Sequence, residues 1–294
     1  MVERTLHYTH LIKDYLVLTK PGIVTLVLIT TLGGVYIGAK GDLDPIVTFW
    51  TLLGTGLAAA GSAVINMVLD RDIDSLMERT ASRPLPRGSV SPVGAFLFGT
   101  LLILTSFTLM FLFVNPIATF LTILASFSYI VLYTILLKRK TPVATEIGGI
   151  SGALPPVIGY VAGAGEFDIR ALTLFLIMFM WQPPHFWALA LKYREDYVRA
   201  GIPTLPVSRG IKVTKIKTLL YTVSLLPLSL VPYALGMTGK VYLLTASFMS
   251  LLYLILTLKF LFSKKEESMK LFFFSIIYIA VLFAVMIVDL VKVG

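Results

Sequence analysis

Apolar residues run through this sequence in long stretches, separated by shorter polar segments. Nine of the stretches are about 20 residues long, which is the length an α-helix needs to cross the hydrocarbon core of a bilayer. Helices are expected because backbone exposed to lipid must satisfy its own hydrogen bonds. The predicted spans are 22–39, 46–69, 93–114, 117–137, 143–164, 171–191, 218–237, 241–258 and 271–288.

Polar and proline-containing segments separate these spans. Asn115-Pro116 divides the third span from the fourth, and the run from Lys138 to Pro142 ends the fourth. We expect Pro183-Pro184 to interrupt the sixth span near one end. Because no polar segment is long enough for a soluble domain, the prediction is one all-α polytopic membrane domain over residues 1–294.

Composition supports a membrane protein: 57% of the residues are hydrophobic and only 14% are charged, against roughly 25% charged in soluble domains. The net charge of +9 invites a nucleic-acid interpretation, but the basic residues concentrate in alternate loops, as membrane topology requires. We therefore expect membrane lipid and no nucleic acid as a partner. The absence of cysteine excludes disulfides, thiolate metal sites and cysteine nucleophiles.

The distribution of lysine and arginine predicts the orientation. Twenty-one of the 25 lie in the N-terminal segment and in every second loop, which places these segments in the cytoplasm. The other side carries only Lys40, Arg170, Lys240 and Lys292. With nine spans, the N-terminus is predicted to be cytoplasmic and the C-terminus external, in the inner membrane of a prokaryotic cell.

The most specific local signal is the segment from Asn66 to Asp74. Asn66, Asp70 and Asp74 are spaced four apart, so on a helix they share one face. Three oxygen ligands on one stripe suit Mg²⁺, which often shares its coordination with phosphate and water. The arginines that follow, Arg79, Arg83 and Arg87, suit anionic oxygens. The alternative is a polar helix end meeting water, but the density of acids favours a diphosphate site.

A second candidate segment contains Trp181, His185 and Trp187 around the paired prolines. Irregular backbone at membrane depth lines a cavity or is buried in protein, so His185 is predicted to face a cavity. The alternative is a histidine that only bonds a carbonyl group freed by the helix break. Arg194 and Asp196 follow near the same surface as Asp70 and are expected to complete the metal and diphosphate site. Glu146 is a lone acid inside the fifth span, where it either serves function or pairs with a nearby base.

These segments resemble the intramembrane prenyltransferases of the UbiA superfamily, and within them the heme O synthases. The resemblance covers about residues 20–206 and rests on many short matches in order. They are Lys20-Pro21-Gly22, Leu69 to Asp74, Met77 to Thr80, Arg83-Pro84-Leu85, Leu137-Lys138-Arg139, Thr141-Pro142, Pro155 to Gly159, Pro184 to Leu189 and Tyr193 to Tyr197. One departure is Ala144, where that group usually has asparagine, and no role is assigned there.

The resemblance implies a UbiA-like bundle that transfers the farnesyl group of farnesyl diphosphate to a vinyl group of heme b, with addition of water, to give heme O and diphosphate. Mg²⁺ is the implied cofactor, and a downstream heme-modifying oxidase is a candidate partner. The implied metal and catalytic residues are Asn66, Asp70 and Asp74, with Asp196 as a further metal ligand. Diphosphate binding falls to Lys20, Arg71, Arg79, Arg83, Arg87, Lys138, Arg139 and Arg194, and heme binding to His185 and Trp187.

Two other functions fit parts of the sequence. Another intramembrane prenyltransferase would use a quinone precursor or a lipid as acceptor, but such enzymes carry a second Asp-x-x-x-Asp motif where this chain has His185 and Tyr193 to Tyr197. A transporter would place its polar residues near the membrane midplane, whereas here they gather at one face.

Overall fold

The computed structural model describes residues 2–263 and 267–291, and in these ranges the regular elements are all helical. Nine helical segments there are long and apolar enough to cross a membrane, which confirms the predicted number of spans. Lys264, Lys265 and Lys292, which were used for the orientation, lie outside the described residues.

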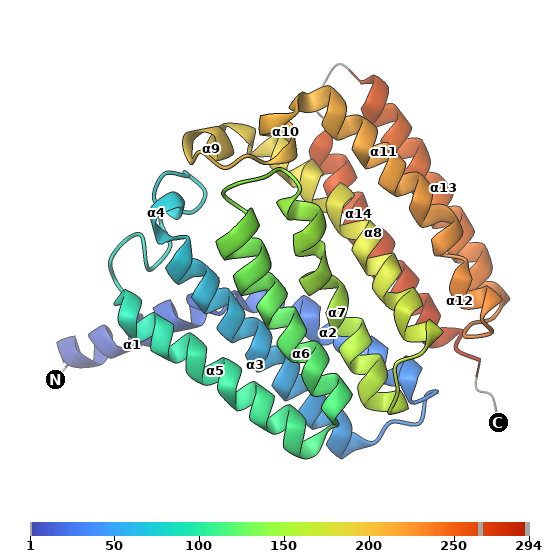
Figure 1. The fold of residues 1–294 in the computed structure, drawn as a ribbon, viewed down its shortest axis with the longest axis horizontal. Coiled ribbons are helices and arrows are strands. Elements are labelled where there is room, and N and C mark those ends of the chain that lie inside the picture. The colour runs from blue at the N-terminus through green and yellow to red at the C-terminus, as the bar shows by residue number, and fades with distance from the viewer. Residues whose placement is uncertain (1, 264–266, 292–294) are drawn as a thin grey trace.

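The helices pack side by side and form a bundle (Figure 1). They are α1 (Val2–Leu18), α2 (Pro21–Gly38), α3 (Pro45–Leu69), α4 (Arg71–Asp74), α5 (Pro92–Phe113), α6 (Pro116–Phe127), the π-helix η1 (Ser128–Leu137), α7 (Ala144–Ala164), α8 (Ile169–Lys192), α9 (Arg194–Arg199), α10 (Leu205–Ser208), α11 (Gly210–Leu228), α12 (Val231–Ala234), α13 (Lys240–Phe262) and α14 (Ser268–Val288). The fourth span consists of α6 and η1, and the seventh consists of α11 and α12.

Local sequence explains where several spans begin. Asp44, Ser91, Asn115 and Asp168 each accept hydrogen bonds from backbone N–H groups of the first turn that follows. Such caps satisfy donors that have no partner within the helix. Proline occupies the first turn of α3, α5 and α6, where its missing N–H costs nothing.

The expected interruption of the sixth span at Pro183-Pro184 is wrong, because α8 runs without a break from Ile169 to Lys192. Both prolines are buried, and α8 packs against α7, α11 and α14. Neighbouring helices in a membrane bundle compensate for the hydrogen bonds that a proline removes, so a spanning helix tolerates it.

Helices α2 and α7 approach each other through glycine. A Cβ atom on Gly34 would lie 2.0 Å from the carbonyl oxygen of Pro156, and one on Gly159 would lie 2.0 Å from that of Thr31. Any side chain there would push the two backbones apart. Small residues permit this close packing between membrane helices, where dispersion contacts drive association.

One end of the bundle carries the short elements α4, α9 and α10 (Figure 1). The C-terminal ends of α3 and α8 and the N-terminal ends of α7 and α11 meet them there. The predicted acidic motif, the basic run after η1 and the Tyr193 to Tyr197 segment therefore come together at this polar end.

Candidate active site

The acidic motif lies at the junction of α3 and α4. Asp70 ends α3, and the backbone N–H of Asp74 donates to the carbonyl oxygen of Asp70 at 2.8 Å, so helical spacing continues across the junction. Asn66, Asp70 and Asp74 are all buried, with 4%, 1% and 3% exposure. The Asn66 Nδ2 group donates to Oδ2 of Asp70 at 2.7 Å. Two of the three predicted ligands are thus in direct contact.

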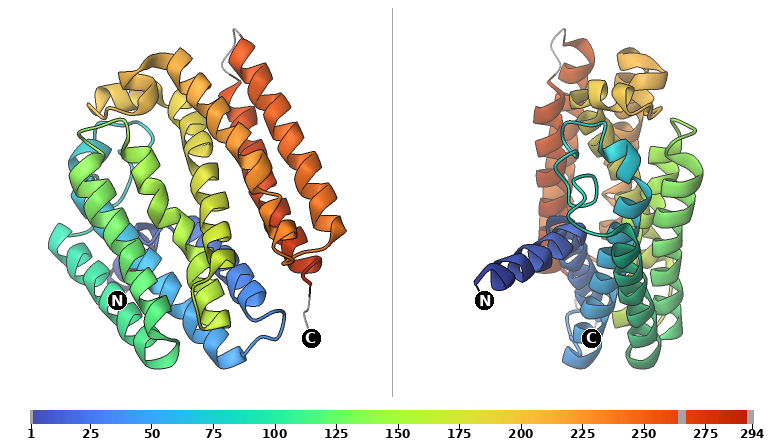
Figure 2. Two further views of the ribbon diagram at one scale, coloured as in Figure 1. Left: turned by 45° about the vertical axis from the view of Figure 1, so that its right-hand side comes forward. Right: turned by 90° about the vertical axis from the view of Figure 1, so that its left-hand side faces the viewer.

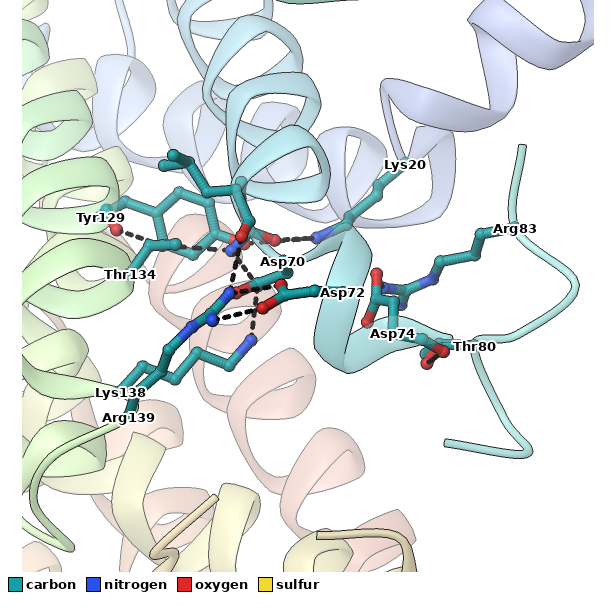
Figure 3. Close-up of polar contacts among 12 residues, drawn as sticks. Lys20, Asp70, Asp72, Asp74, Thr80, Arg83, Tyr129, Thr134, Lys138 and Arg139 are labelled. Carbon is teal, nitrogen blue, oxygen red and sulfur yellow. Dashed lines mark hydrogen bonds and ion pairs between the residues drawn. The ribbon is translucent and has the colours of Figure 1, made fainter. Parts of the chain in front are cut away.

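Two lysines from distant segments converge on this pair of residues (Figure 3). Lys138 Nζ lies 2.5 Å from Oδ2 of Asp70, and Lys20 Nζ donates to Oδ1 of Asn66 at 2.8 Å. Lys20 also donates to the Tyr129 hydroxyl at 3.3 Å. Burial lowers the pKa of Lys20 to about 8, because the charged form loses water around it.

Asp74 is held separately, by Arg83 on the loop that follows α4. Arg83 Nη1 lies 2.6 Å from Oδ2 of Asp74, and Thr80 Oγ1 donates to the Asp74 carbonyl oxygen at 2.8 Å. Figure 3 shows Arg83 and Asp74 on the opposite side of α4 from Lys138 and Arg139. The loop therefore folds back so that its arginine neutralises the last acid of the motif.

Arg139 ties the end of η1 to the same junction. Its two terminal nitrogens donate to the two carboxylate oxygens of Asp72 at 2.7 Å each, and Nη2 also donates to the Leu69 carbonyl oxygen at 2.7 Å. This bidentate hydrogen bond lowers the pKa of the Asp72 carboxyl. Asp72, rather than Asp70, is therefore the acid that engages Arg139 closely, since Asp70 Oδ1 lies 3.9 Å from Arg139 Nη2.

The donor atoms at the junction fit Mg²⁺ in their chemistry. Oδ1 of Asp70 is buried and has no hydrogen-bond partner, and a buried carboxylate oxygen left in this way suits a cation. Oxygens of Asn66 and Asp74 are the next donors along the stripe, and Mg²⁺ prefers oxygen ligands. The described residues contain no cluster of three or more acidic, histidine or cysteine side chains placed to hold a metal, so phosphate or water oxygens would have to complete its coordination.

Asp196, the fourth predicted metal ligand, has no described contact with the other three. It is buried on α9, where it forms an ion pair with Arg199. Arg199 also contacts Glu78, at 3.1 Å. Arg199 therefore connects α9 to the loop after α4. The carboxylate of Asp196 is paired with this arginine.

The remaining predicted arginines diverge. Arg87 pairs with Asp14 on α1 at 2.6 Å, while Arg71 is exposed at the start of α4. Arg194 Nε donates to the Pro206 carbonyl oxygen at 3.1 Å, and the Arg79 guanidinium lies 5.2 Å from the centre of the Tyr193 ring. The structure thus brings Lys20, Lys138 and Arg139 to Asn66 and Asp70, and Arg83 to Asp74. Arg79 lies near Lys20 and Tyr197 and so remains close to this cluster, whereas Arg71, Arg87 and Arg194 have no described contact with it.

His185 and Trp187 face different helices. The His185 ring is stacked between Trp181 and Phe272, with both ring centres 4.5 Å away, and its Nδ1 lies 2.7 Å from Ser275 Oγ. The hydrogen bond described for the ring engages Nδ1. Trp187 is fully buried and meets Tyr221 of α11 edge to face at 5.3 Å.

Sequence reasoning missed the contribution of η1. Asn66 Nδ2 donates to Thr134 Oγ1 at 3.1 Å, and Thr134 Oγ1 donates back to the Tyr129 carbonyl oxygen five residues earlier, at 2.8 Å. The Lys138 N–H likewise bonds the Tyr133 carbonyl oxygen five residues earlier. Wide π-helical turns occur often at functional sites. Here they turn Lys138 inward, and Thr134, one of several polar residues in the apolar span, did not by itself indicate this.

A pocket opens beside Lys138, between η1, α7, α8 and the segment after α9. Its walls include Tyr133, Phe186 and Tyr197, and Thr204 contributes a buried hydroxyl without a hydrogen-bond partner. The cavity is small, about 10 Å³, which is room for roughly one water molecule. It places aromatic surface directly next to the acidic and basic cluster.

Comparison with known proteins gives consistent matches. The sequence profile of the UbiA prenyltransferase family matches residues 27–283. The chain is 67% identical to the protoheme IX farnesyltransferase of Aquifex aeolicus strain VF5, over 99% of this chain and 100% of that protein. It is 44% identical to protoheme IX farnesyltransferase 1 of Pseudomonas putida strain GB-1, over 94% of both.

Solved structures share the fold. A digeranylgeranylglyceryl phosphate synthase matches with a TM-score of 0.82 at 23% identity, covering 97% of this chain and 100% of that one. A UbiA homologue from Archaeoglobus fulgidus, bound to GPP and Mg²⁺, matches with a TM-score of 0.60 at 20% identity, covering 93% and 99%. The chain therefore belongs to the UbiA prenyltransferase family and, within it, to the protoheme IX farnesyltransferases.

Proposed function

We propose that this enzyme transfers the farnesyl group of farnesyl diphosphate to a vinyl group of heme b (protoheme IX), with addition of water, and so forms heme O and diphosphate. The observation that carries the proposal is the buried carboxylate of Asp70, which has one oxygen free of hydrogen bonds and Lys138 and Lys20 directly beside its cluster. The relatives at 67% and 44% identity are protoheme IX farnesyltransferases, which supports the choice of substrates.

The first step is the departure of diphosphate from the allylic carbon. Breaking that C–O bond leaves the electron pair and the negative charge on the diphosphate and a cation on the farnesyl chain. Lys20, Lys138 and Arg139 supply positive charge and hydrogen-bond donors at the polar end, and such preorganised groups stabilise charge as it develops. Mg²⁺, held by Asp70 with Asn66 and Asp74, would neutralise the diphosphate further.

The second step joins the farnesyl cation to the vinyl group. The vinyl π-electrons form the new C–C bond, the positive charge moves to the carbon next to the porphyrin ring, and water adds there and releases a proton. No strong base is needed, which agrees with the lack of a nucleophile–base pair in the sequence. Helices must shield the first cation from water, and the aromatic side chains of Tyr133, Phe186 and Tyr197, which lie near Lys138, would contribute to such shielding.

For heme b we propose a position at the α8–α14 contact, with Nε2 of His185 toward the iron. Neutral imidazole is a common axial ligand of heme iron. Ser275 Oγ holds Nδ1 at 2.7 Å and thereby fixes the ring orientation, as a hydrogen bond to the other ring nitrogen does in many metal sites. Trp187 is fully buried against Tyr221 of α11, so we propose that it supports α8 rather than touching the porphyrin.

The polar end is proposed to face the cytoplasm of the cell, since 21 of 25 lysines and arginines fall on that side by the span assignment. Water-soluble diphosphate would then leave directly into the cytoplasm. The apolar farnesyl chain would extend among the helices.

The test is product mass from purified protein supplied with heme b, farnesyl diphosphate and Mg²⁺. The expected product has the mass of heme b plus one farnesyl group and one hydroxyl group. Asp70→Asn protein serves as the negative control. Parallel reactions with an aromatic acid or a lipid alcohol as acceptor distinguish the other prenyltransferase classes. Prenylation of one of those acceptors, with heme b unchanged, would overturn the proposal.

A further inference from the structure

The N-terminal helix α1 precedes the first span and is not part of it. Only Thr19 and Lys20 separate its last residue, Leu18, from Pro21 at the start of α2. In Figure 2 α1 extends away from the side of the bundle, crosswise to the spanning helices. Its side chains are described from His10 onward.

One face of α1 is held firmly by the protein. Leu18 is fully buried in a cluster with Val64 and Leu85, and Leu11 and Tyr15 pack against that cluster. On the same face Asp14 forms an ion pair with Arg87 at 2.6 Å. Contacts over two turns, one of them ionic, leave the helix little freedom to rotate about its axis.

A second face of α1 is apolar and uncovered. Ile12 and Leu16 are four residues apart, so they form one stripe along the helix. Their exposed fractions are 63% and 57%. Contact of such large apolar side chains with water is unfavourable, so a cover for them is expected. Lys13 and His10 are also exposed, but they lie farther around the helix, with the less exposed Val17 near them.

The position of this stripe identifies what covers it. Leu16 lies five residues before the start of a membrane span, so it cannot be far from the bilayer surface. Ile23 and Leu26, near the start of α2, are also exposed, and α2 is long and apolar enough to cross the membrane. A helix with one apolar and one polar face lies in the plane of the interface, with its apolar side chains among the acyl chains.

We propose that α1 is an interfacial membrane anchor, with Ile12 and Leu16 inserted into the lipid and Lys13 and His10 directed to water. The occupant of the stripe is the lipid surface itself. The Asp14–Arg87 ion pair sets the rotation of the helix and links it to the loop after α4, and this loop also carries Arg83, the partner of Asp74. The anchor thereby positions that loop relative to the membrane.

The absence of cysteine allows a direct test with single spin labels. Full-length Ile12→Cys, Leu16→Cys and Lys13→Cys proteins are labelled in lipid nanodiscs, and collision rates with oxygen and with a water-soluble nickel complex are measured. Leu26→Cys supplies the lipid reference, and Glu78→Cys, whose native side chain is 82% exposed, supplies the water reference. Positions 12 and 16 are expected to favour oxygen several-fold, like position 26, and position 13 to resemble position 78.

Two results would overturn the proposal. Labels at positions 12 and 16 that collide with nickel as freely as position 78 would place α1 in water. Labels shielded from both reagents would show that protein, such as a second copy of the chain, covers the stripe. Neither result bears on prenyl transfer, which is measured separately.

Trypsin provides a second measurement without labels, because it cuts after Lys13. In nanodiscs the Ile12→Glu, Leu16→Glu double variant is expected to be cut there several-fold faster than the wild type, since the glutamates expel the helix from the lipid. Val17→Glu is the matched control: it adds a charge to the same helix on the polar side and should change the rate little. Equal rates for the double variant and the wild type would contradict the proposal.

Discussion

Lys138 and Asp70, 68 residues apart, form an acid–base contact in the candidate site, with 2.5 Å between Nζ and Oδ2. Their side chains are 16% and 2% exposed, so water does little to screen the attraction. The ammonium group neutralises the carboxylate that we propose as a metal ligand. Diphosphate, with its own negative charge, would draw Lys138 away and leave Asp70 to the metal.

Lys138→Gln tests this exchange. Without diphosphate, the variant is expected to bind Mn²⁺, a spectroscopic substitute for Mg²⁺, about tenfold more tightly than the wild type, because a competing positive charge has been removed. With diphosphate present, turnover should fall because a donor to the leaving group is lost. Electron paramagnetic resonance of free Mn²⁺ measures the affinity. Lys140→Gln, an exposed lysine two residues away, is the control, and equal Mn²⁺ affinities for both variants would refute the exchange.

Asp70→Asn and Asp74→Asn are expected to lose Mg²⁺-dependent heme O formation by at least about tenfold each, in line with the loss of metal-site groups in other proteins. Both proteins should still insert and fold, since asparagine keeps the size of the side chain. Product formation is measured against Mg²⁺ concentration, with Asp42→Asn in a loop at the other end of the bundle as the matched control. Near wild-type rates for both variants would remove the metal assignment.

His185→Ala is expected to weaken heme b binding and to shift the absorption spectrum of the bound heme, because the axial ligand is lost. Farnesyl diphosphate binding should be largely unchanged, since the groups proposed to hold it lie around Asp70. Ser275→Ala keeps the imidazole but removes its 2.7 Å hydrogen bond, so a smaller spectral change is expected. A heme titration of the purified variants decides: a His185→Ala spectrum and affinity equal to the wild type would exclude ligation.

The proposed orientation predicts the location of the C-terminus. With the N-terminus in the cytoplasm and nine spans, a reporter fused after Gly294 should be active only outside the cytoplasm. A second fusion within the loop between α8 and α11 should show the opposite activity. A cytoplasmic signal from the Gly294 fusion would reverse the orientation.

The sequence alone predicted the number of spans and the helix face shared by Asn66 and Asp70. Both follow from local properties of the chain: apolar length decides whether a helix can cross the bilayer, and spacing by four decides which side chains share a face. The span limits moved by a few residues, except at α11, which begins at Gly210 rather than at residue 218. The first turns of α11 are polar, so a search for a continuous apolar stretch places the start of this span too late.

Tertiary structure alone decided which base meets which acid. Arg83 and Arg87 lie four residues apart on one loop, yet the first pairs with Asp74 and the second with Asp14 on α1. Lys138 reaches Asp70 because η1 widens its turns, and α8 stays continuous through Pro183-Pro184 because other helices surround it. A long basic side chain can meet any acid within its reach, so the pairing depends on how the helices pack, which composition and spacing do not specify.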